Sequence, residues 1–392
     1  MIKKVLEKKR WHKRVNNKEV VLITDHIKPR VVKIGYALRN KNFRIVLILK
    51  KQSKSEISKT GIKFFDKVCF FEGKEEVYKK CLLFSPLVYH IFMEAYVEEW
   101  AEYIIRNKTE IGKVVYDQYD IYRGFVINEL DEAGQREKYC LENADGLCCR
   151  MFETQHLKHK YHYQFKGKRI LFLDYCWNNN NNVPAINGED DRLKFVYGGR
   201  LLARPISNAD RYKIELHGFE HLARTIHNHN DYFVMIPSKP CKGTEYSAYR
   251  SMRRKYSHLL IKDPMDFSTL INYESHMDYG IDCVELEKDM EKYCEQVNSF
   301  NMRAKNRYYA TNKYFDYLDA GVMPIYGRKG EMFGNFLSRV GGAIWCSLEE
   351  MPDKMEELRK EREINKKKVC EARDVLAIDK QIGRLIAFYK DI

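Results

Sequence analysis

Residues 311 to 327, TNKYFDYLDAGVMPIYG, place one carboxylate where it could hold the hydroxyls of a sugar ring. Apolar side chains recur at helical spacing over residues 314–318, so one face of the predicted helix is buried and Asp316 can point elsewhere. Gly321 is expected to end this helix before the apolar strand around Pro324. A carboxylate accepts two hydroxyl hydrogen bonds in a fixed fork, which suits the ribose of a nucleotide. The alternative is an ordinary helix-to-strand junction of an α/β protein.

A second group of residues has the types that bind a diphosphate. Gly198-Gly199-Arg200 follows a predicted strand, so two glycines allow close approach of the backbone and Arg200 offers a bidentate cation. Asn312 and Lys313, at the start of the helix that carries Asp316, could add further donors. An ordinary turn and a solvated helix start are the alternatives.

Two acidic residues mark a candidate site in the first half of the chain. Asp117 and Asp120 lie at the end of a predicted strand over residues 113–120, where doubly wound sheets bind ligands. Either could act as general base on an acceptor hydroxyl or orient a donor sugar. Helix caps are the alternative. Asp25-His26, after the first predicted strand, is a similar candidate of lower weight.

The elements that would position these residues alternate between strand and helix. A chain of 392 residues predicts two domains. In the first half we expect strands at 20–25, 43–49, 67–71 and 113–120, a helix between the first two, a long helix over 88–106 and another over 132–143. A polar linker is predicted between 153 and 168. A second alternating set is expected from 169–176 onward, with strands at 193–199, 231–238, 258–264, 277–283 and 341–347, and an amphipathic helix over 375–389.

The motif around Asp316 and the order of elements resemble retaining nucleotide-sugar glycosyltransferases of the GT-B type. The resemblance implies two Rossmann-like, doubly wound α/β domains facing across a cleft, with a final helix crossing back to the first domain. The expected domains are residues 1–160 on the acceptor side, 168–374 for the nucleotide sugar, and the helix 375–392. The sequence departs from the family pattern at Tyr308, where a second Glu is usual, and at Met323, where proline is usual.

The resemblance also implies roles for particular residues. Asp316 stands where the family has its ribose-binding Glu, and Lys313 matches the motif Lys. Arg200 would stabilise the departing diphosphate, with Arg204 as a second cation. Base recognition would come from the loop after a second-domain strand, here Ile261 and Lys262. The implied reaction moves a sugar from a nucleoside diphosphate to an acceptor hydroxyl, without a metal or other cofactor.

The net charge and the cysteine spacing narrow the range of possible partners and locations. The formal net charge of +14 predicts an acidic partner, and because the charge is spread along the chain, a phosphate-bearing substrate or an anionic membrane face is favoured over nucleic acid. The acceptor would be a glycan, a lipid-linked sugar or a protein, with bacterial surface polysaccharide synthesis as the expected setting. With no signal peptide and no CxxC pair, a cytoplasmic protein, peripheral to the inner face of the membrane at most, is expected. The alternatives are a sugar-nucleotide epimerase on the same plan and a basic nucleic-acid or membrane-surface binding protein.

Overall fold

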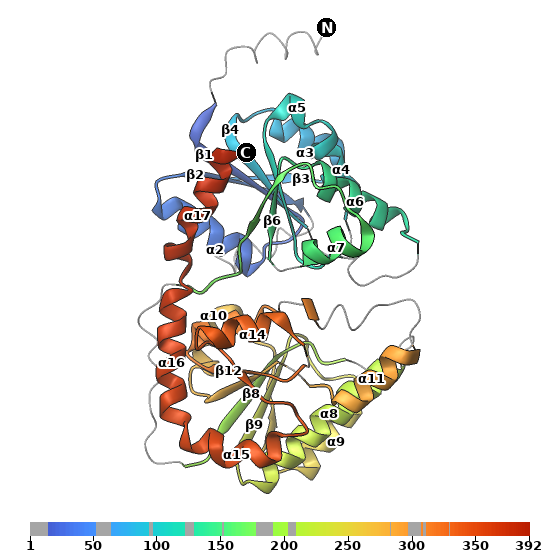
Figure 1. Ribbon diagram of the computed structural model, residues 1–392, viewed down its shortest axis with the longest axis vertical. Coiled ribbons are helices and arrows are strands. Elements are labelled where there is room, and N and C mark those ends of the chain that lie inside the picture. The colour runs from blue at the N-terminus through green and yellow to red at the C-terminus, as the bar shows by residue number, and fades with distance from the viewer. Residues whose placement is uncertain are drawn as a thin grey trace. The chain divides into compact units, whose positions relative to one another are not determined.

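The computed structural model describes residues 15–51, 64–93, 97–121, 129–150, 153–177, 191–202, 209–282, 284–296, 307–308, 311–328 and 330–392. The chain divides into two compact units: unit 1 comprises Met1–Asp174 with Ile378–Ile392, and unit 2 comprises Tyr175–Ala377. Each unit contains one sheet with helices packed against it (Figure 1). In the ranges just given, all named strand pairs of both sheets are parallel.

The sheet of unit 1 has seven strands in the order β3-β2-β1-β4-β5-β6-β7. Their bounds are β1 Asn16–Thr24, β2 Arg44–Lys50, β3 Lys67–Phe71, β4 Pro86–Met93, β5 Val114–Gln118, β6 Gly146–Cys149 and β7 Lys168–Leu171. The chain adds strands on one side of β1 and then on the far side of β4. The order of strands therefore reverses between β1 and β4, which is the switch point of a doubly wound sheet.

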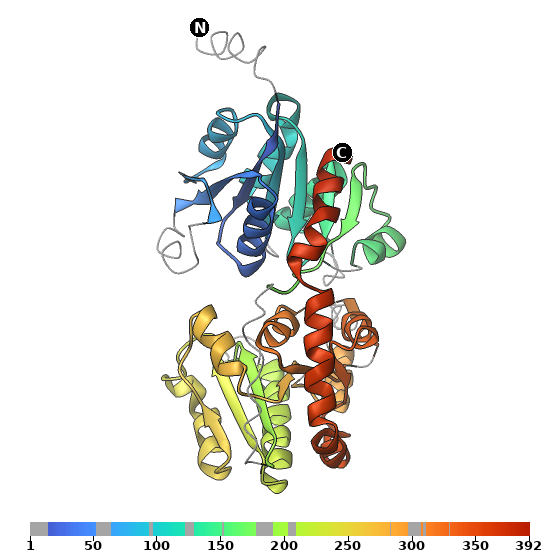
Figure 2. The same ribbon diagram turned by 90° about the vertical axis from the view of Figure 1, so that its left-hand side faces the viewer.

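The helices of unit 1 connect these strands and cover both faces. They are α2 Pro29–Asn40, α3 Lys74–Cys81, α4 Glu99–Arg106, α5 Lys108–Ile111, α6 Glu132–Asn143, α7 Glu153–Tyr161 and α17 Ile378–Asp391. Helix α17, from the end of the chain, packs against α2 and β4, as Figure 2 shows. Its buried side includes Ile382, Leu385 and Tyr389, so the amphipathic pattern of this segment has its apolar face in unit 1.

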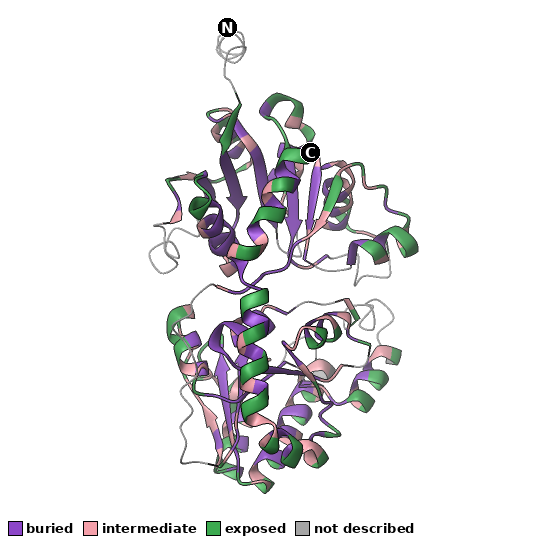
Figure 3. Cartoon of the chain, turned by 60° about the vertical axis from the view of Figure 1, so that its left-hand side comes forward, coloured by how far each residue is buried: buried purple, intermediate pink, exposed green. Residues whose placement is uncertain are grey.

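The sheet of unit 2 has six strands in the order β10-β9-β8-β11-β12-β13. They span β8 Lys194–Gly199, β9 Tyr232–Pro237, β10 Leu259–Ile261, β11 Tyr279–Ile281, β12 Met323–Tyr326 and β13 Ile344–Trp345. The strand order reverses between β8 and β11. In both units the strands are largely buried and the exposed residues lie mainly on the helices (Figure 3).

The helices of unit 2 are α8 Ala209–Asn228, α9 Ser247–Lys255, α10 Phe267–Glu274, α11 Glu287–Gln296, α13 Lys313–Ala320, α14 Met332–Arg339, α15 Met351–Lys360 and α16 Arg362–Val375, with a 3₁₀ turn at Thr244–Tyr246. Helix α13 ends at Gly321, which has a φ of 73°, as the sequence predicts. A side chain is disfavoured at this left-handed position, and the amide of Gly321 hydrogen-bonds back to Leu318. The prediction of two doubly wound α/β domains is confirmed.

Four local predictions are wrong. The segment predicted as one helix over residues 88–106 contains the buried strand β4 and then the separate helix α4. Residues 153–168, predicted as a linker, form α7 and the start of β7. Strand β7 pairs with β6, so it extends the first sheet instead of opening the second, and the units divide after Asp174. The predicted last helix begins at Ile378, because residues up to Val375 belong to α16.

Among the described residues, no helix is both long enough and apolar enough to cross a bilayer.

Candidate functional site

The switch point of unit 2 brings the ends of β8 and β11 together. Strands β8 and β11 pair only at Tyr279 with Phe195 and at Gly280 with Val196. Beyond these pairs the phenol of Tyr317, from α13, lies between the two strands. The amide of Gly198 donates to its oxygen at 3.0 Å, and its hydroxyl donates to the carbonyl of Ile281 at 3.0 Å. This buried tyrosine therefore separates the strand ends and satisfies both backbone groups.

Gly199 and Lys313, which the sequence suggests for diphosphate binding, are neighbours at this point. A Cβ added to Gly199 would stand 2.7 Å from Lys313 Cε, so the glycine leaves room for the lysine. Lys313 Nζ lies 4.3 Å from the centroid of the Tyr197 ring and 3.5 Å from Asp282 Oδ1. A cation-π contact and an ion pair thus hold the ammonium beside the end of β8.

Arg200 extends this basic region toward β9. Its side chain lines a pocket of about 90 Å³ together with Leu201, Ser238, Lys239 and Tyr246. The backbone on each side is fixed, because Ser238 N donates to the carbonyl of Gly199 at 3.0 Å and the Tyr197 hydroxyl donates to the carbonyl of Arg200 at 3.0 Å. Two cationic side chains beside a glycine turn form a suitable environment for a phosphate group.

Asp316 lies in the first turn of α13, half-buried, on the helix that also supplies Lys313 and Tyr317. A carboxylate in this turn is favoured by the helix dipole. Asn312 precedes the helix, and its carbonyl accepts the amides of Phe315 and Asp316. Lys313 and Asp316 therefore belong to one rigid turn, three residues apart, which is the spacing of neighbours on a helix surface.

The remaining predicted residues of unit 2 have different placements. Ile261 is the last residue of the edge strand β10 and Lys262 follows it; β9 separates β10 from β8. Two strand spacings put them about 10 Å from Gly199. The Lys262 ammonium lies 5.4 Å from the centroid of the Tyr273 ring. Arg204 lies outside the described residues.

Three charged residues at this end of the sheet are missed by the sequence argument. Asp282 directly follows β11, Arg328 follows β12, and Glu331 immediately precedes α14. Arg328 Nη1 donates to Asp282 Oδ2 at 2.5 Å. The signal that could have found Asp282 is the one used for Asp117, an acidic residue at the end of a buried strand; the contacts with Arg328 and Glu331 are visible only in the fold.

In unit 1 the two predicted acids have different environments. Asp120 is partly exposed beyond β5, and its carbonyl accepts a hydrogen bond from Gln118 Nε2 at 3.0 Å. Asp117 is fully buried, and Arg30 Nε donates to its Oδ2 at 2.8 Å. An enclosed, ion-paired carboxylate cannot accept a proton from an acceptor substrate, so in this structure Asp117 has a structural role, whereas Asp120 remains accessible.

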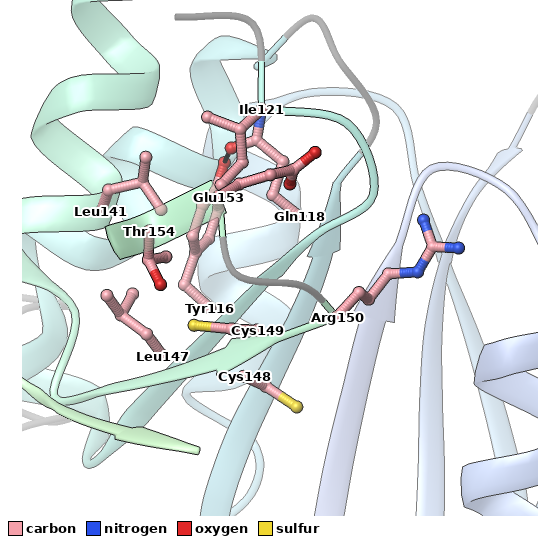
Figure 4. Close-up of a pocket in the computed structure, with 10 residues that line it drawn as sticks. All are labelled: Tyr116, Gln118, Ile121, Leu141, Leu147, Cys148, Cys149, Arg150, Glu153 and Thr154. Carbon is pink, nitrogen blue, oxygen red and sulfur yellow. Dashed lines mark hydrogen bonds between the residues drawn. The ribbon is translucent and has the colours of Figure 1, made fainter. Parts of the chain in front are cut away.

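A small cavity lies at the ends of β5 and β6, close to Asp120. It has a volume of about 10 Å³, room for one water molecule, so it is too small for a sugar acceptor. Figure 4 shows the side chains of Gln118 and Glu153 near Ile121, whereas the Arg150 guanidinium extends away from this group. At the switch point between β1 and β4, Asp25 is buried and its Oδ1 accepts the amide of His26 at 2.9 Å.

Among the residues that the structure describes, one group has ligand atoms close enough to hold a metal ion: His90, Asp117 and Cys148, whose ligand atoms lie within 4.8 Å of one another. Arg30 already occupies this group, because its guanidinium donates to Asp117 and, at 3.3 Å, to Cys148 Sγ. Burial raises the pKa of the Cys148 thiol well above its ordinary value, which favours the neutral form. A thiol beside a fixed cation does not fit a divalent metal.

The same group instead forms a buried network that joins distant segments. Arg30 also donates to the carbonyls of Phe172 and Leu173 and to Asp174 Oδ1, and Arg150 donates to Asp174 Oδ2 at 2.6 Å.

His90 extends this network to the last helix of the chain. Its Nε2 lies 3.4 Å from Asp117, and its Nδ1 lies 2.6 Å from the hydroxyl of Tyr389 on α17. Burial would raise the pKa of Asp117, but Arg30 and His90 hold it below the ordinary value. Two arginines balance two carboxylates here, so the charges are compensated within the network.

Comparisons with known proteins identify the fold. No protein-family model and no curated protein sequence matches the chain. Among solved structures, a putative UDP-N-acetylglucosamine 2-epimerase from Listeria monocytogenes is similar with a TM-score of 0.56 and 8% identity, over 94% of this chain and 95% of that one. The UDP-GlcNAc 2-epimerase from Neisseria meningitidis bound to UDP-GlcNAc has a TM-score of 0.55 and 8% identity, over 95% and 100%.

A transferase is similar to the same extent. An alpha-glucosyltransferase in complex with UDP and a 13-mer DNA has a TM-score of 0.54 and 12% identity, over 91% of this chain and 94% of that one. At such low identities these likenesses describe architecture, shared here by transferases and epimerases. The chain therefore has the GT-B fold.

Proposed function

We propose that this protein is a glycosyltransferase that moves a sugar from a nucleoside diphosphate sugar to an acceptor hydroxyl. One observation carries the proposal: Lys313 stands against Gly199 at the switch point of unit 2, between Tyr197 and Asp282, beside the basic pocket of Arg200. Doubly wound sheets bind nucleotides at this location.

The proposed roles follow from position and charge. Lys313 and Arg200 would stabilise the negative charge that grows on the departing diphosphate, and Lys239, which lines the pocket of Arg200, would assist. Asp316 would accept hydrogen bonds from the ribose hydroxyls. Ile261 and Lys262, at the edge of the sheet, would face the base.

In unit 1, Asp120 is the proposed general base for the acceptor hydroxyl. The acceptor would be a glycan, a lipid-linked sugar or a protein, and bacterial surface polysaccharide synthesis remains the proposed setting. A cytoplasmic location, peripheral to an anionic membrane, also remains a proposal; the net charge of +14 supports it.

The second candidate is a sugar-nucleotide epimerase, because two of the similar solved structures carry that name. An epimerase would use the same nucleotide site but would need an acid and a base beside the sugar. Asp117 is enclosed and paired with Arg30, so this acid and base would have to be other residues.

A ligand screen followed by product analysis tests the proposal. The melting temperature of the full chain would be measured with UDP, GDP, ADP and dTDP and with the corresponding nucleotide sugars. A ligand that binds the folded state raises the melting temperature by mass action. We expect one nucleotide series to stabilise the protein.

The stabilising nucleotide sugar would then be incubated with the protein, with and without candidate acceptors, and the products analysed by NMR. Release of nucleoside diphosphate with formation of a new glycosidic bond supports transfer. Conversion to an epimeric sugar nucleotide would replace this proposal by the epimerase. Failure of every nucleotide and nucleotide sugar to bind would refute both.

A further inference from the structure

A cluster of charged side chains lies behind Lys313, where β11 and β12 end. Its centre is Arg328, which contacts three carboxylates: Asp282 Oδ2 at 2.5 Å, Glu285 Oε2 at 3.3 Å and Glu331 Oε2 at 3.8 Å. Asp282 and Glu331 are each only 1% exposed. The cluster is therefore nearly closed to solvent, and Lys313, 3.5 Å from Asp282 Oδ1, links it to the basic region described above.

The three carboxylates are not equally compensated. Asp282 contacts both Arg328 and Lys313. Glu285 contacts Arg328 and also interacts electrostatically with Arg211 on α8. For Glu331, the one ion-pair contact among the residues described is the longer one with Arg328. Its Oε2 has no hydrogen-bond donor among these residues.

The groups that contact or face Glu331 come from several elements of unit 2. The hydroxyl of Tyr314, on α13, donates to its Oε1 at 2.7 Å, and the amide of Gly334, on α14, is a second donor. Arg328 supplies a positive charge and Asp282 a negative one. Burial raises the pKa of Glu331 to about 7; Arg328 opposes this rise and the charge of Asp282 adds to it. For Asp282, burial would raise the pKa, but Arg328 and Lys313 hold it below the ordinary value.

An anion that binds Lys313 must change this balance. The positive charge of Lys313 is then shared with the anion, so less of it compensates Asp282. Arg328 must then compensate the charge of Asp282 more fully. As a result, less of its positive charge stabilises the carboxylate of Glu331, which has no other close cation among the described residues. In a region that excludes water, these charges interact strongly, and the neutral form of Glu331 becomes favoured.

We propose that the end of β8 in unit 2 is a site for a tetrahedral oxyanion, which binds together with one proton taken up by Glu331. The identity of the natural oxyanion as a diphosphate rests on the proposed function, but the link between anion and proton rests on the cluster alone. The occupied site holds the anion against Lys313 and Gly199, with Glu331 as a carboxylic acid hydrogen-bonded to Tyr314.

Sulfate is the probe that separates this linkage from the ligand's own protonation, because sulfate stays a dianion over the working pH range whereas phosphate does not. Binding of sulfate to the full chain would be measured by titration calorimetry near pH 7.5, at constant ionic strength, in two buffers with different heats of ionisation. The difference between the two apparent binding heats gives the number of protons taken up. We expect a positive value below one proton, because a carboxyl with a pKa of about 7 is already partly protonated at pH 7.5.

Three variants give the test its controls. Glu331→Gln resembles the protonated acid and can keep the bond from Tyr314, so it should bind sulfate with no proton uptake. Glu350→Gln alters an exposed carboxylate that precedes α15 as Glu331 precedes α14, and should behave as the parent does. Lys313→Met should lose sulfate binding, which locates the site.

The parent protein also provides a measurement that needs no variant. Its sulfate affinity should fall as the pH rises from 6 to 8, by less than tenfold for each pH unit, the limit for a single linked proton. Absence of sulfate binding, binding without proton uptake, or uptake that persists in Glu331→Gln would overturn the proposal.

The outcome is separable from that of the proposed function. Proton-linked sulfate binding with no binding of any nucleotide sugar would support this site and refute the glycosyltransferase proposal. A nucleotide sugar that binds and reacts without proton uptake would support the function and refute the linkage.

Discussion

Lys313 and Gly199 are in such close contact that no side chain fits at residue 199 without moving the lysine: Lys313 Cε lies 2.7 Å from the place of an added Cβ. Gly199→Ala should therefore displace the ammonium from Asp282 and Tyr197. We expect a loss of roughly 1.5–3 kcal/mol in the binding of nucleoside diphosphate, the value of one hydrogen bond to a charged group. Gly199 also has a φ of 159°, which residues with a side chain rarely adopt, so the substitution should lower the stability of unit 2 as well, and affinity is compared well below the melting temperature of the variant.

Gly73→Ala is the control for this change, because nothing lies within 4 Å of a Cβ at that position. Both variants would be compared by calorimetric titration and by thermal unfolding. Equal nucleotide affinity in Gly199→Ala and the parent would show that Lys313 does not bind the diphosphate.

Asp316→Asn tests the proposed ribose contact. Loss of a charge-assisted hydrogen bond should weaken nucleotide binding by roughly 1–3 kcal/mol while the fold is retained. Asp353→Asn is a matched control, since Asp353 is an exposed acid in the first turn of α15. If the two variants bind nucleotide equally well, or if Asp316→Asn unfolds, Asp316 is a structural residue.

Arg200→Ala separates chemistry from binding. Arg200 is placed to interact with charge that develops on the leaving diphosphate, so its removal should lower turnover by about 10²–10³ and donor affinity by much less. The measurement is a comparison of kcat with donor binding. Transfer at close to the parental rate would show that the side chain of Arg200 takes no part in the reaction.

Asp120→Asn should have a different kinetic effect. As the proposed base in unit 1, Asp120 acts on the acceptor, so donor affinity should stay normal while the rate of transfer falls. Its effect should also diminish with an acceptor whose hydroxyl is more acidic. A loss of donor binding equal to the loss of rate would contradict this role.

Arg30→Met should destabilise unit 1 strongly, because it leaves the buried Asp117 without its closest cation. Removing one partner of a buried ion pair typically costs about 3–5 kcal/mol. The double variant Arg30→Met/Asp117→Leu should recover part of this loss, since Asp174 keeps Arg150. Urea unfolding of the full chain would measure both; a double variant less stable than Arg30→Met would argue against the pairing.

The same network predicts the effect of acid on unit 1. The pKa of Asp117 and that of Asp174 are lower in the folded state than in ordinary aspartates, despite their burial, because the arginines favour the charged form. Their contribution to stability is therefore complete above the ordinary aspartate pKa, about 4, and is lost as the pH falls below it. The double variant should show a weaker dependence of the unfolding free energy on pH in this range.

The sequence predicts the parts of the fold in which local pattern and tertiary role agree. The helix that carries Asp316, its end at Gly321 and the glycines after β8 follow from spacing and residue type. The pattern fails for β4, PLVYHIFM, which lies in the middle of the sheet and is apolar on both faces except at His90. Such a strand shows no period of two, so its pattern does not separate it from the following helix.

The site was harder to predict than the fold, because it depends on contacts between distant segments. Asp117 has the sequence context of a catalytic acid, yet Arg30, 87 residues earlier, encloses it. Tyr317 looks like an apolar residue of a helix, but its hydroxyl bridges the ends of β8 and β11. Glu331 gains its unusual environment from Asp282 and Arg328, and nothing in its local sequence indicates this.

The placement of α17 in unit 1 has a consequence for biosynthesis. Unit 2 is continuous in the sequence, whereas unit 1 is completed only by Ile378–Ile392. During translation, His90 therefore lacks its partner Tyr389 until all of unit 2 has left the ribosome. Unit 2 can finish folding first, reversing the usual order in which the N-terminal domain of a growing chain is completed before the next. Until then, the surfaces of α2 and β4 that α17 covers stay exposed in the nascent chain, and exposed apolar surface of this kind is what chaperones bind.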